Sequence, residues 1–227
     1  MESIHSWRRV FRDSLPVMAG YIVLGIGFGI LLRTKGYGVP WAFAMSFFIY
    51  AGSLQYVGID LLSGGVSLLT TAVTSLLVNA RHLFYGISML ERYRGAGKAK
   101  PYLIFALTDE TYSLVCTEKG RDLRYCLRLS ALDQLYWVTG SVTGSLLGSV
   151  LPFDTAGIDF SLTALFITVV VEQWLAASDH TPALIGAGAS VLCLLLFGPG
   201  SFLLPSMGVI TVLLLLLAQR KGGADHA

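Results

Sequence analysis

The chain has 227 residues, of which 54% are hydrophobic and 13% are charged, and its formal net charge is +2. Its mean hydropathy is +0.68. A chain this apolar is not an ordinary soluble domain, and so small a positive charge offers no basic surface for nucleic acid.

Eight apolar segments follow one another along the chain, with short polar turns between them. They cover residues 15–32, 41–62, 66–90, 101–117, 130–151, 160–177, 182–197 and 202–218. Because a helix needs about 20 apolar residues to cross a bilayer, the series predicts an all-α, polytopic integral membrane protein with about seven to eight transmembrane segments. We expect a single transmembrane domain over residues 1–227.

Lysine and arginine are spread unevenly among the loops. Three precede the first segment, four lie in residues 91–100, four lie in residues 118–129, and none lies in residues 151–159. The positive-inside rule then predicts cytoplasmic N and C termini and an external 151–159 loop. Eight full crossings would leave the basic 91–100 loop outside. Therefore either segment 66–90 or segment 101–117 does not cross simply.

Two groups of glycines recur at a spacing of four residues, which places each group on one helix face. Gly25 and Gly29 form the first group, and Gly140, Gly144 and Gly148 form the second. Small residues let helix backbones approach closely in a membrane. The faces can serve internal packing or the docking of a partner helix.

A weak internal repeat relates the two halves of the chain, residues 15–117 and 130–218. Three positions recur at identical spacing, namely Phe48, Gln55 and Tyr56 as Phe166, Gln173 and Trp174. A break follows in each half, at residues 79–82 and at residues 198–200. Paired interrupted helices are typical of secondary transporters, in which the freed backbone groups bind substrate. Chance similarity between apolar helices is the alternative explanation.

Arg81 lies inside the apolar run 66–90. On insertion scales a central arginine costs roughly 2.5–3.5 kcal/mol unless it faces a partner or water. An arginine near a helix end can instead extend its side chain to the membrane interface. Position 81 lies just past the midpoint of the run, so it is not near an end. If the helix unwinds at Asn79, its side chain and Arg81 can converge on one ligand. We predict that Arg81, Asn79 and Gln55 bind substrate, although Gln55 can equally bridge two helices.

Asp109 and Glu110 occupy the centre of segment 101–117, whereas three other acids fall toward segment ends, namely Asp60, Asp133 and Glu172. Adjacent helical residues point about 100° apart, so one carboxylate can pair with Arg81 while the other carries a proton. His82 can also titrate near neutral pH, or it can stay a neutral hydrogen-bonding residue. We predict that Asp109, Glu110 and His82 couple transport to protons. The alternative places this segment in the interface, with both acids hydrated.

The chain resembles a known family, AzlC, which is the large subunit of bacterial two-component branched-chain amino acid exporters. The stretches that carry the resemblance are 24–29, 51–56, 76–83, 108–111, Tyr136-Trp137 with Gly140 and Gly144, and Asp159-Phe160 followed by 164–166. The resemblance implies export of valine, leucine or isoleucine together with a small AzlD-type membrane subunit. It assigns no binding residues.

Two other functions compete with a proton-coupled exporter. A non-transporting assembly subunit is suggested by the glycine faces. An intramembrane hydrolase would use Ser53 and His82 as a dyad, but no GxSxG motif surrounds Ser53 and such an enzyme gives no role to Arg81. We expect no enzymatic activity, cofactor or metal, and no nucleic-acid partner. Three cysteines lack metal-ligand spacing, namely Cys116, Cys126 and Cys193.

Overall fold

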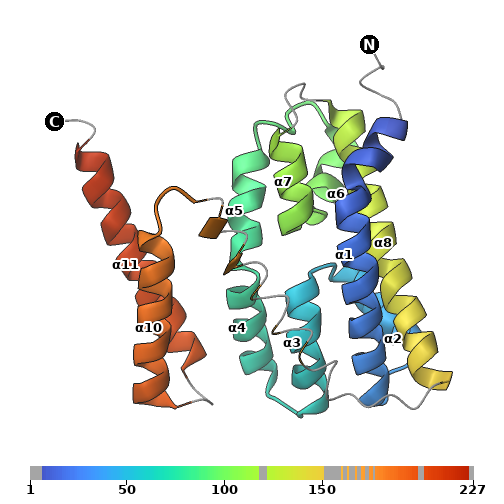
Figure 1. Cartoon of the computed structure of the whole chain (residues 1–227), viewed down its shortest axis with the longest axis horizontal. Coiled ribbons are helices and arrows are strands. Elements are labelled where there is room, and N and C mark those ends of the chain that lie inside the picture. The colour runs from blue at the N-terminus through green and yellow to red at the C-terminus, as the bar shows by residue number, and fades with distance from the viewer. Residues whose placement is uncertain are drawn as a thin grey trace. The chain divides into compact units, whose positions relative to one another are not determined.

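The computed structural model describes residues 7–117, 122–150, 160, 163, 167, 170, 171, 174, 175, 177–198 and 202–224. Within these residues every regular element is a helix (Figure 1). The chain divides into two compact units, Met1–Thr163 and Ala164–Ala227, which are considered separately. Expectations from the sequence that fall outside the described residues concern the 151–159 loop, residues 164–166, Glu172, Gln173, Pro199 and Gly200.

Helices α1 (Trp7–Thr34) and α8 (Leu123–Val150) form the centre of the first unit and lie side by side (Figure 1). The ring of Tyr21 contacts that of Trp137 with centroids 5.5 Å apart. One turn further along both helices, Gly25 lies against Ser141. Because the contacts advance together along the two sequences, α1 and α8 run in the same direction.

The two predicted glycine faces pack against each other, one from α1 and the other from α8. A Cβ on Gly25 would lie 2.9 Å from the backbone nitrogen of Ser141. A Cβ on Gly29 or Gly144 would overlap the opposing backbone outright. Of the two roles considered, internal packing is therefore correct. The hypothesis that the Gly140, Gly144 and Gly148 face docks a partner is wrong, because α1 already occupies it.

The expected span 41–62 is not one crossing helix. It forms α2 (Val39–Phe48) and α3 (Gly52–Ser63), separated by three non-helical residues, among which Tyr50 has a φ of +44°. Tyr37, just before α2, donates a hydrogen bond to the carbonyl of Leu62 near the end of α3, at 3.1 Å. The two open ends thus lie together, and we call this α2–α3 pair the first hairpin.

Helices α4 (Leu68–Val78) and α5 (Ala80–Met89) follow as a nearly continuous pair. They are separated only by Asn79, whose φ and ψ are −94° and 4°. The interruption predicted at this residue is confirmed. The pair begins beside the open end of the first hairpin and ends near Tyr93, which shares a buried cluster with Val10 at the start of α1. Therefore α4 and α5 traverse the unit in the direction opposite to α1.

After a short 3-10 turn, η1 (Gly97–Ala99), helix α6 (Lys100–Phe105) runs back along α5. The ammonium of Lys100 donates to the carbonyl of Leu90 at 3.4 Å, at the end of α5. Ile104 lies beside Gly86, one turn earlier in α5. Helix α6 is therefore antiparallel to α5.

Helix α7 (Asp109–Thr117) then reverses direction again. Its first residue, Asp109, contacts Arg81 near the start of α5. Tyr112, one turn later in α7, stacks on Tyr85, one turn later in α5, with ring centroids 4.3 Å apart. Since α7 is parallel to α5 and α6 is antiparallel, α6 and α7 form a second hairpin. Of the two alternatives left open for residues 101–117, the segment turns back.

The two hairpins open toward opposite ends of α1, and their tips meet near its middle (Figure 1). The rings of Tyr50 and Phe105, one from each tip, lie 6.2 Å apart. From α8, the amide of Gln134 donates to the carbonyl of Phe47 at 3.0 Å and accepts from the hydroxyl of Tyr102 at 2.9 Å. The first hairpin fills the lower half of the unit in Figure 1, and the second fills the upper half.

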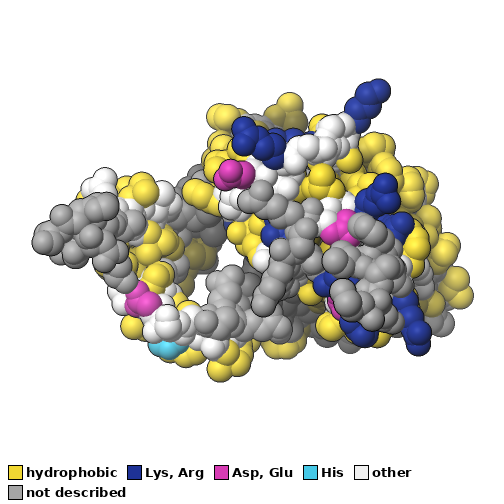
Figure 2. Space-filling model, turned by 90° about the horizontal axis from the view of Figure 1, so that it is seen from above, with side chains coloured by type: hydrophobic (Ala, Val, Ile, Leu, Met, Phe, Trp, Pro, Cys, Tyr) yellow, Lys and Arg dark blue, Asp and Glu magenta, His cyan; other side chains and the backbone are white. Residues whose placement is uncertain are grey.

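This arrangement removes the conflict among the basic loops. The beginning of α1, the 91–100 loop and the beginning of α8 all lie at one end of the unit, where Tyr125 donates to Asp13 at 3.1 Å. Figure 2 views the molecule from this end and shows Lys and Arg side chains over it. The loop that disobeyed the positive-inside rule under eight crossings thus joins the other basic segments.

The number of spans stays a prediction. Within the described residues, α1 is the one helix that is both long and apolar enough to cross a membrane. Shorter apolar helices cover Val39–Phe48, Thr181–Phe197 and Gly208–Leu217.

The second unit contains α10 (Thr181–Phe197) packed on α11 (Leu203–Ala224). Before α10, the ring of His180 stacks on Trp174 with centroids 4.1 Å apart. Helix α10 ends at Gly198, whose φ of +72° favours glycine. The break predicted here is confirmed at Gly198, while Pro199 and Gly200 lie outside the described residues. The division into two repeat halves stays a prediction.

Candidate functional site

Three helix beginnings converge on Arg81. Its Nη1 lies 2.6 Å from Oδ2 of Asp109, and its Nη2 donates to Oγ of Ser53 at 2.7 Å. Arg81 is in the first turn of α5, Asp109 begins α7, and Ser53 is in the first turn of α3. The ion pair predicted between Arg81 and one of the two carboxylates is confirmed. A hairpin from each end of the unit therefore supplies one partner of the arginine.

The helix dipoles act on the two charges in opposite ways. Helix N-termini carry partial positive charge, so Asp109 and Glu110 in the first turn of α7 are stabilised there. Arg81 lies at the same end of α5, where a cation is disfavoured. The contact with Asp109 offsets this cost, and the exposed fractions of the two side chains are only 31% and 25%. Arg81 thus depends on its acidic partner.

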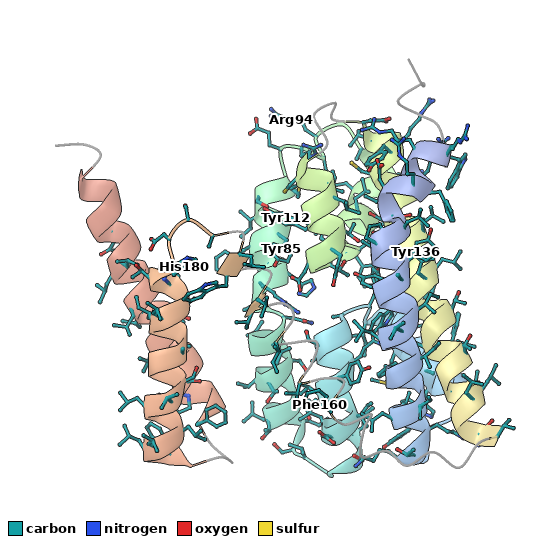
Figure 3. The ribbon with its side chains drawn as sticks, in the orientation of Figure 1. Tyr85, Arg94, Tyr112, Tyr136, Phe160 and His180 are labelled. Atoms are coloured by element: carbon teal, nitrogen blue, oxygen red, sulfur yellow. The ribbon has the colours of Figure 1, made fainter. Side chains whose placement is uncertain are left out.

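A tyrosine orients the second oxygen of Asp109. Tyr85 donates to Oδ1 at 2.6 Å, and its own ring is held by stacking on Tyr112. Figure 3 shows Tyr85 and Tyr112 side by side, from α5 and α7. The ring of His82 lies 5.9 Å from that of Tyr85. Both oxygens of Asp109 are therefore engaged, one by a charge and one by a neutral donor.

Three neighbouring residues each hold a buried polar atom without a hydrogen-bond partner. These atoms are Oδ1 of Asn79, Nε of Arg81 and Nδ1 of His82. Unsatisfied buried polar atoms are costly and call for an explanation, for which a functional site is one of the common ones. Asn79 and His82 thus lie close to Arg81 in the chain, and each has unused hydrogen-bonding capacity.

Gln55 lies apart from this group and bridges helices. It is fully buried, donates to Oγ of Ser46 at 3.1 Å and accepts from Nε1 of Trp137 at 2.8 Å. It therefore ties α3 to α2 and α8. Of the two roles considered from the sequence, the structure shows the bridging one.

Glu110 diverges from Asp109 and faces α1. Tyr21, in the middle of α1, has its hydroxyl 2.7 Å from Oε2 of Glu110 and 2.6 Å from Oγ1 of Thr108. Thr108 in turn donates to Thr111 at 3.1 Å. The predicted separation of the two adjacent carboxylates is confirmed. One meets a guanidinium, and the other meets only hydroxyl groups among the side-chain contacts described.

Sequence reasoning missed Asp133. It was expected near the end of a segment beginning at residue 130, but α8 begins at Leu123, which places Asp133 well inside the helix and fully buried. Its Oδ2 accepts from Thr111 at 2.8 Å. The sequence did contain a signal for the earlier start of α8, because Asp122 is a residue type favoured at the N-cap of a helix. In the structure, Oδ1 of Asp122 accepts a hydrogen bond from the backbone nitrogen of Arg124 at 3.0 Å.

Ser53 does not form the dyad considered for a hydrolase. Its hydroxyl is bound by Arg81, and no hydrogen bond joins it to His82 in the part of the chain that the structure describes. A serine held by a guanidinium is not activated by a base.

Known proteins similar to this chain are membrane proteins. The profile of the family described as AzlC protein matches residues 16–151. A Bacillus subtilis protein, "Branched-chain amino acid transport protein AzlC", is 42% identical over 219 residues, which cover 92% of this chain and 85% of that protein. An "Uncharacterized membrane protein" of Helicobacter pylori J99 is 41% identical over 226 residues, covering 96% and 99%.

A more distant relative is the "Inner membrane protein YgaZ" of Escherichia coli K12. It is 31% identical over 193 residues, which cover 79% of each chain. No solved structure matches this chain.

Proposed function

This chain belongs to the AzlC family, and we propose that it exports branched-chain amino acids across a bacterial inner membrane in exchange for protons. The observation that carries the proposal is the Arg81–Asp109 ion pair, formed where α3, α5 and α7 begin. Charged groups at interrupted helices are typical of secondary transporters.

The ion pair suits a zwitterion. The guanidinium of Arg81 can bind the substrate carboxylate, and Asp109 can bind its ammonium group, so that the substrate takes the place of the direct contact. The unpartnered Oδ1 of Asn79 is a further acceptor for the ammonium. Valine, leucine and isoleucine share this backbone chemistry, and the printed name of the Bacillus subtilis relative supports a branched side chain.

Glu110 is the proton carrier in this proposal. Asp109 is paired directly with the guanidinium of Arg81, whereas Glu110 is hydrogen-bonded to a tyrosine hydroxyl. An adjacent cation favours the ionised form of a carboxyl group, so a carboxyl without one binds a proton more readily than one in an ion pair. His82 is a second candidate, because its Nδ1 is unpartnered.

The hairpins supply two gates. Each opens toward a different end of α1, and their tips meet at the Tyr50–Phe105 contact. Movement of one tip exposes the site to one side while the other tip closes the opposite side. This is the requirement of alternating access.

We place the basic end of the first unit in the cytoplasm, with the N and C termini, in a multi-pass arrangement. The support is the gathering of basic loops at one end of α1. The chain acts as the large subunit beside a small AzlD-type membrane protein. This partnership rests on the family resemblance, because the glycine faces are occupied within the chain. Within the described residues, no specific contact favours the alternative function, a non-transporting assembly subunit.

The test is efflux of labelled valine from proteoliposomes, with this chain alone and with its small partner. We expect efflux to respond to an imposed pH gradient, and Arg81→Lys to weaken it, because an ammonium cannot grip a carboxylate with two parallel hydrogen bonds. Arg94→Lys, at an exposed site (Figure 3), is the matched control. Absence of valine movement in both preparations contradicts the proposal. Full activity of the chain alone contradicts only the obligatory partner.

A further inference from the structure

An unbroken row of hydrogen-bonding groups connects Glu110 to Asp133. The links are Glu110–Tyr21 at 2.7 Å, Tyr21–Thr108 at 2.6 Å, Thr108–Thr111 at 3.1 Å and Thr111–Asp133 at 2.8 Å. The row begins on the second hairpin, passes through α1, returns to the second hairpin and ends on α8. It therefore joins the proposed proton carrier to a carboxyl group that has no role in the substrate site.

The number of hydrogens in the row is informative. Four links need four hydrogens, but Tyr21, Thr108 and Thr111 each have a single hydroxyl hydrogen, which makes three. With both carboxyls ionised, one link would join two acceptors. With both protonated, one hydrogen would have no place in the row. One carboxyl proton completes all four links.

The surroundings of Glu110 and Asp133 also favour a single proton on the two carboxyl groups. Asp133 and Thr111 are fully buried, and Oδ1 of Asp133 has no partner. The titratable groups that act on Asp133 are Glu110 and two tyrosines from the hairpins, namely Tyr50 and Tyr102. Those that act on Glu110 are Asp133, Asp109, Arg81 and three tyrosines, namely Tyr21, Tyr50 and Tyr85. Since Arg81 is already paired with Asp109, two further buried anions would lack compensation.

We infer that Glu110 and Asp133 hold one proton between them and exchange it through Tyr21, Thr108 and Thr111. When Glu110 gives its proton to Tyr21, the phenol passes its own hydrogen to Thr108. Thr108 then passes a hydrogen to Thr111, and Thr111 passes one to Asp133. Each hydroxyl gains and loses one hydrogen, so Glu110 ends ionised and Asp133 ends neutral. Asp133 is thus a second proton site. Its role in transport rests on the proton coupling proposed above.

The shared proton can be tested without transport, by infrared spectroscopy of the purified protein at neutral pH. The wild-type spectrum minus that of Glu110→Gln/Asp133→Asn should contain both a protonated carboxyl band and an ionised carboxylate band. A difference containing only ionised bands, or only protonated bands, overturns the inference. Asp60→Asn is the control, since Asp60 is exposed and takes no part in the row.

The exchange path is tested by cutting the row at Thr111. Thr111→Val keeps the shape but removes the hydroxyl, whereas Thr111→Ser keeps the hydroxyl. In proteoliposomes, Thr111→Val should lower efflux driven by a pH gradient by about tenfold or more. It should leave valine-for-valine exchange intact. Thr111→Ser should retain both. Gradient-driven efflux that survives Thr111→Val overturns the path. If wild-type efflux ignores the gradient, the proposed coupling fails, and the infrared result still decides on the shared proton.

Discussion

The hydroxyl of Tyr37 donates a hydrogen bond to the backbone carbonyl of Leu62, at 3.1 Å. The first residue precedes α2 and the second lies in the last turn of α3, so both ends of an apolar stretch long enough to cross a bilayer are at the same place. The chain enters and leaves this region from one side.

Single-cysteine labelling can test this topology after the three native cysteines have been replaced. We expect cysteines at Lys35 and Ser63 to react with an impermeant reagent from the same side of the membrane, because they flank the first hairpin. A cysteine at Arg94 should react from the opposite side, since it lies at the basic end (Figure 3). All three positions are exposed. Labelling of Lys35 and Ser63 from opposite sides would show that this stretch crosses.

The Arg81–Asp109 pair should dominate local stability. Asp109→Asn leaves the guanidinium without its counter-charge, and breaking a pair of this kind costs about 3 kcal/mol of unfolding free energy. Arg81→Gln/Asp109→Asn should lose less than the sum of the two single changes, with a coupling of about 1–3 kcal/mol. Unfolding in detergent measures all four proteins of the cycle. Additive losses would mean that the contact contributes nothing.

The two adjacent acids should respond differently to neutralisation. Glu110→Gln should abolish efflux driven by the pH gradient and leave valine exchange measurable, because a carboxamide keeps its hydrogen bonds but cannot carry a proton. Asp109→Asn should instead reduce valine binding, since it removes the negative charge that attracts the substrate ammonium. Binding and efflux are measured on the same preparations. If the two variants exchange these effects, the roles of the two residues are reversed.

The α1–α8 contact should not tolerate a methyl group. Gly144→Ala is expected to destabilise the protein by about 2 kcal/mol, because the new Cβ overlaps the backbone of Ile26. Gly20→Ala is the matched control, since its Cβ meets nothing within 4 Å. That change should be neutral or stabilise α1 by about 0.5–1 kcal/mol. Thermal unfolding of both variants checks the difference, and equal effects would show that the helices separate easily.

Much of the site could be predicted from single residues. Arg81 is too costly inside an apolar run to be unpaired, and Asp109 and Glu110 are the acids placed to meet it. The break at Asn79 follows from a polar cluster at the middle of the run. Each of these inferences needs only the identity of a residue and the polarity of its neighbours.

The hairpins could not be predicted in the same way. Hydropathy counts apolar residues, and an apolar stretch that turns back at Tyr50 has the same composition as one that continues. The signals for turning are weak, because Tyr50 is not a glycine although its φ is +44°. Asp133 was missed for a related reason. The start of α8 is polar, so the apolar count began seven residues too late and put a central carboxyl at an edge.

The fit between α1 and α8 has a consequence for movement. Where two backbones touch with no room for a methyl group, the fit is close, so we expect α1 and α8 to move together as one rigid body. The hairpins differ from it, because each is made of short helices joined by three non-helical residues, at 49–51 and at 106–108. In the proposed transport cycle we therefore expect the hinges at these two joints, with Tyr21 and Asp133 at a fixed separation. A spectroscopic ruler between α1 and α8 should read the same length in every state, and one between the hairpin tips should not.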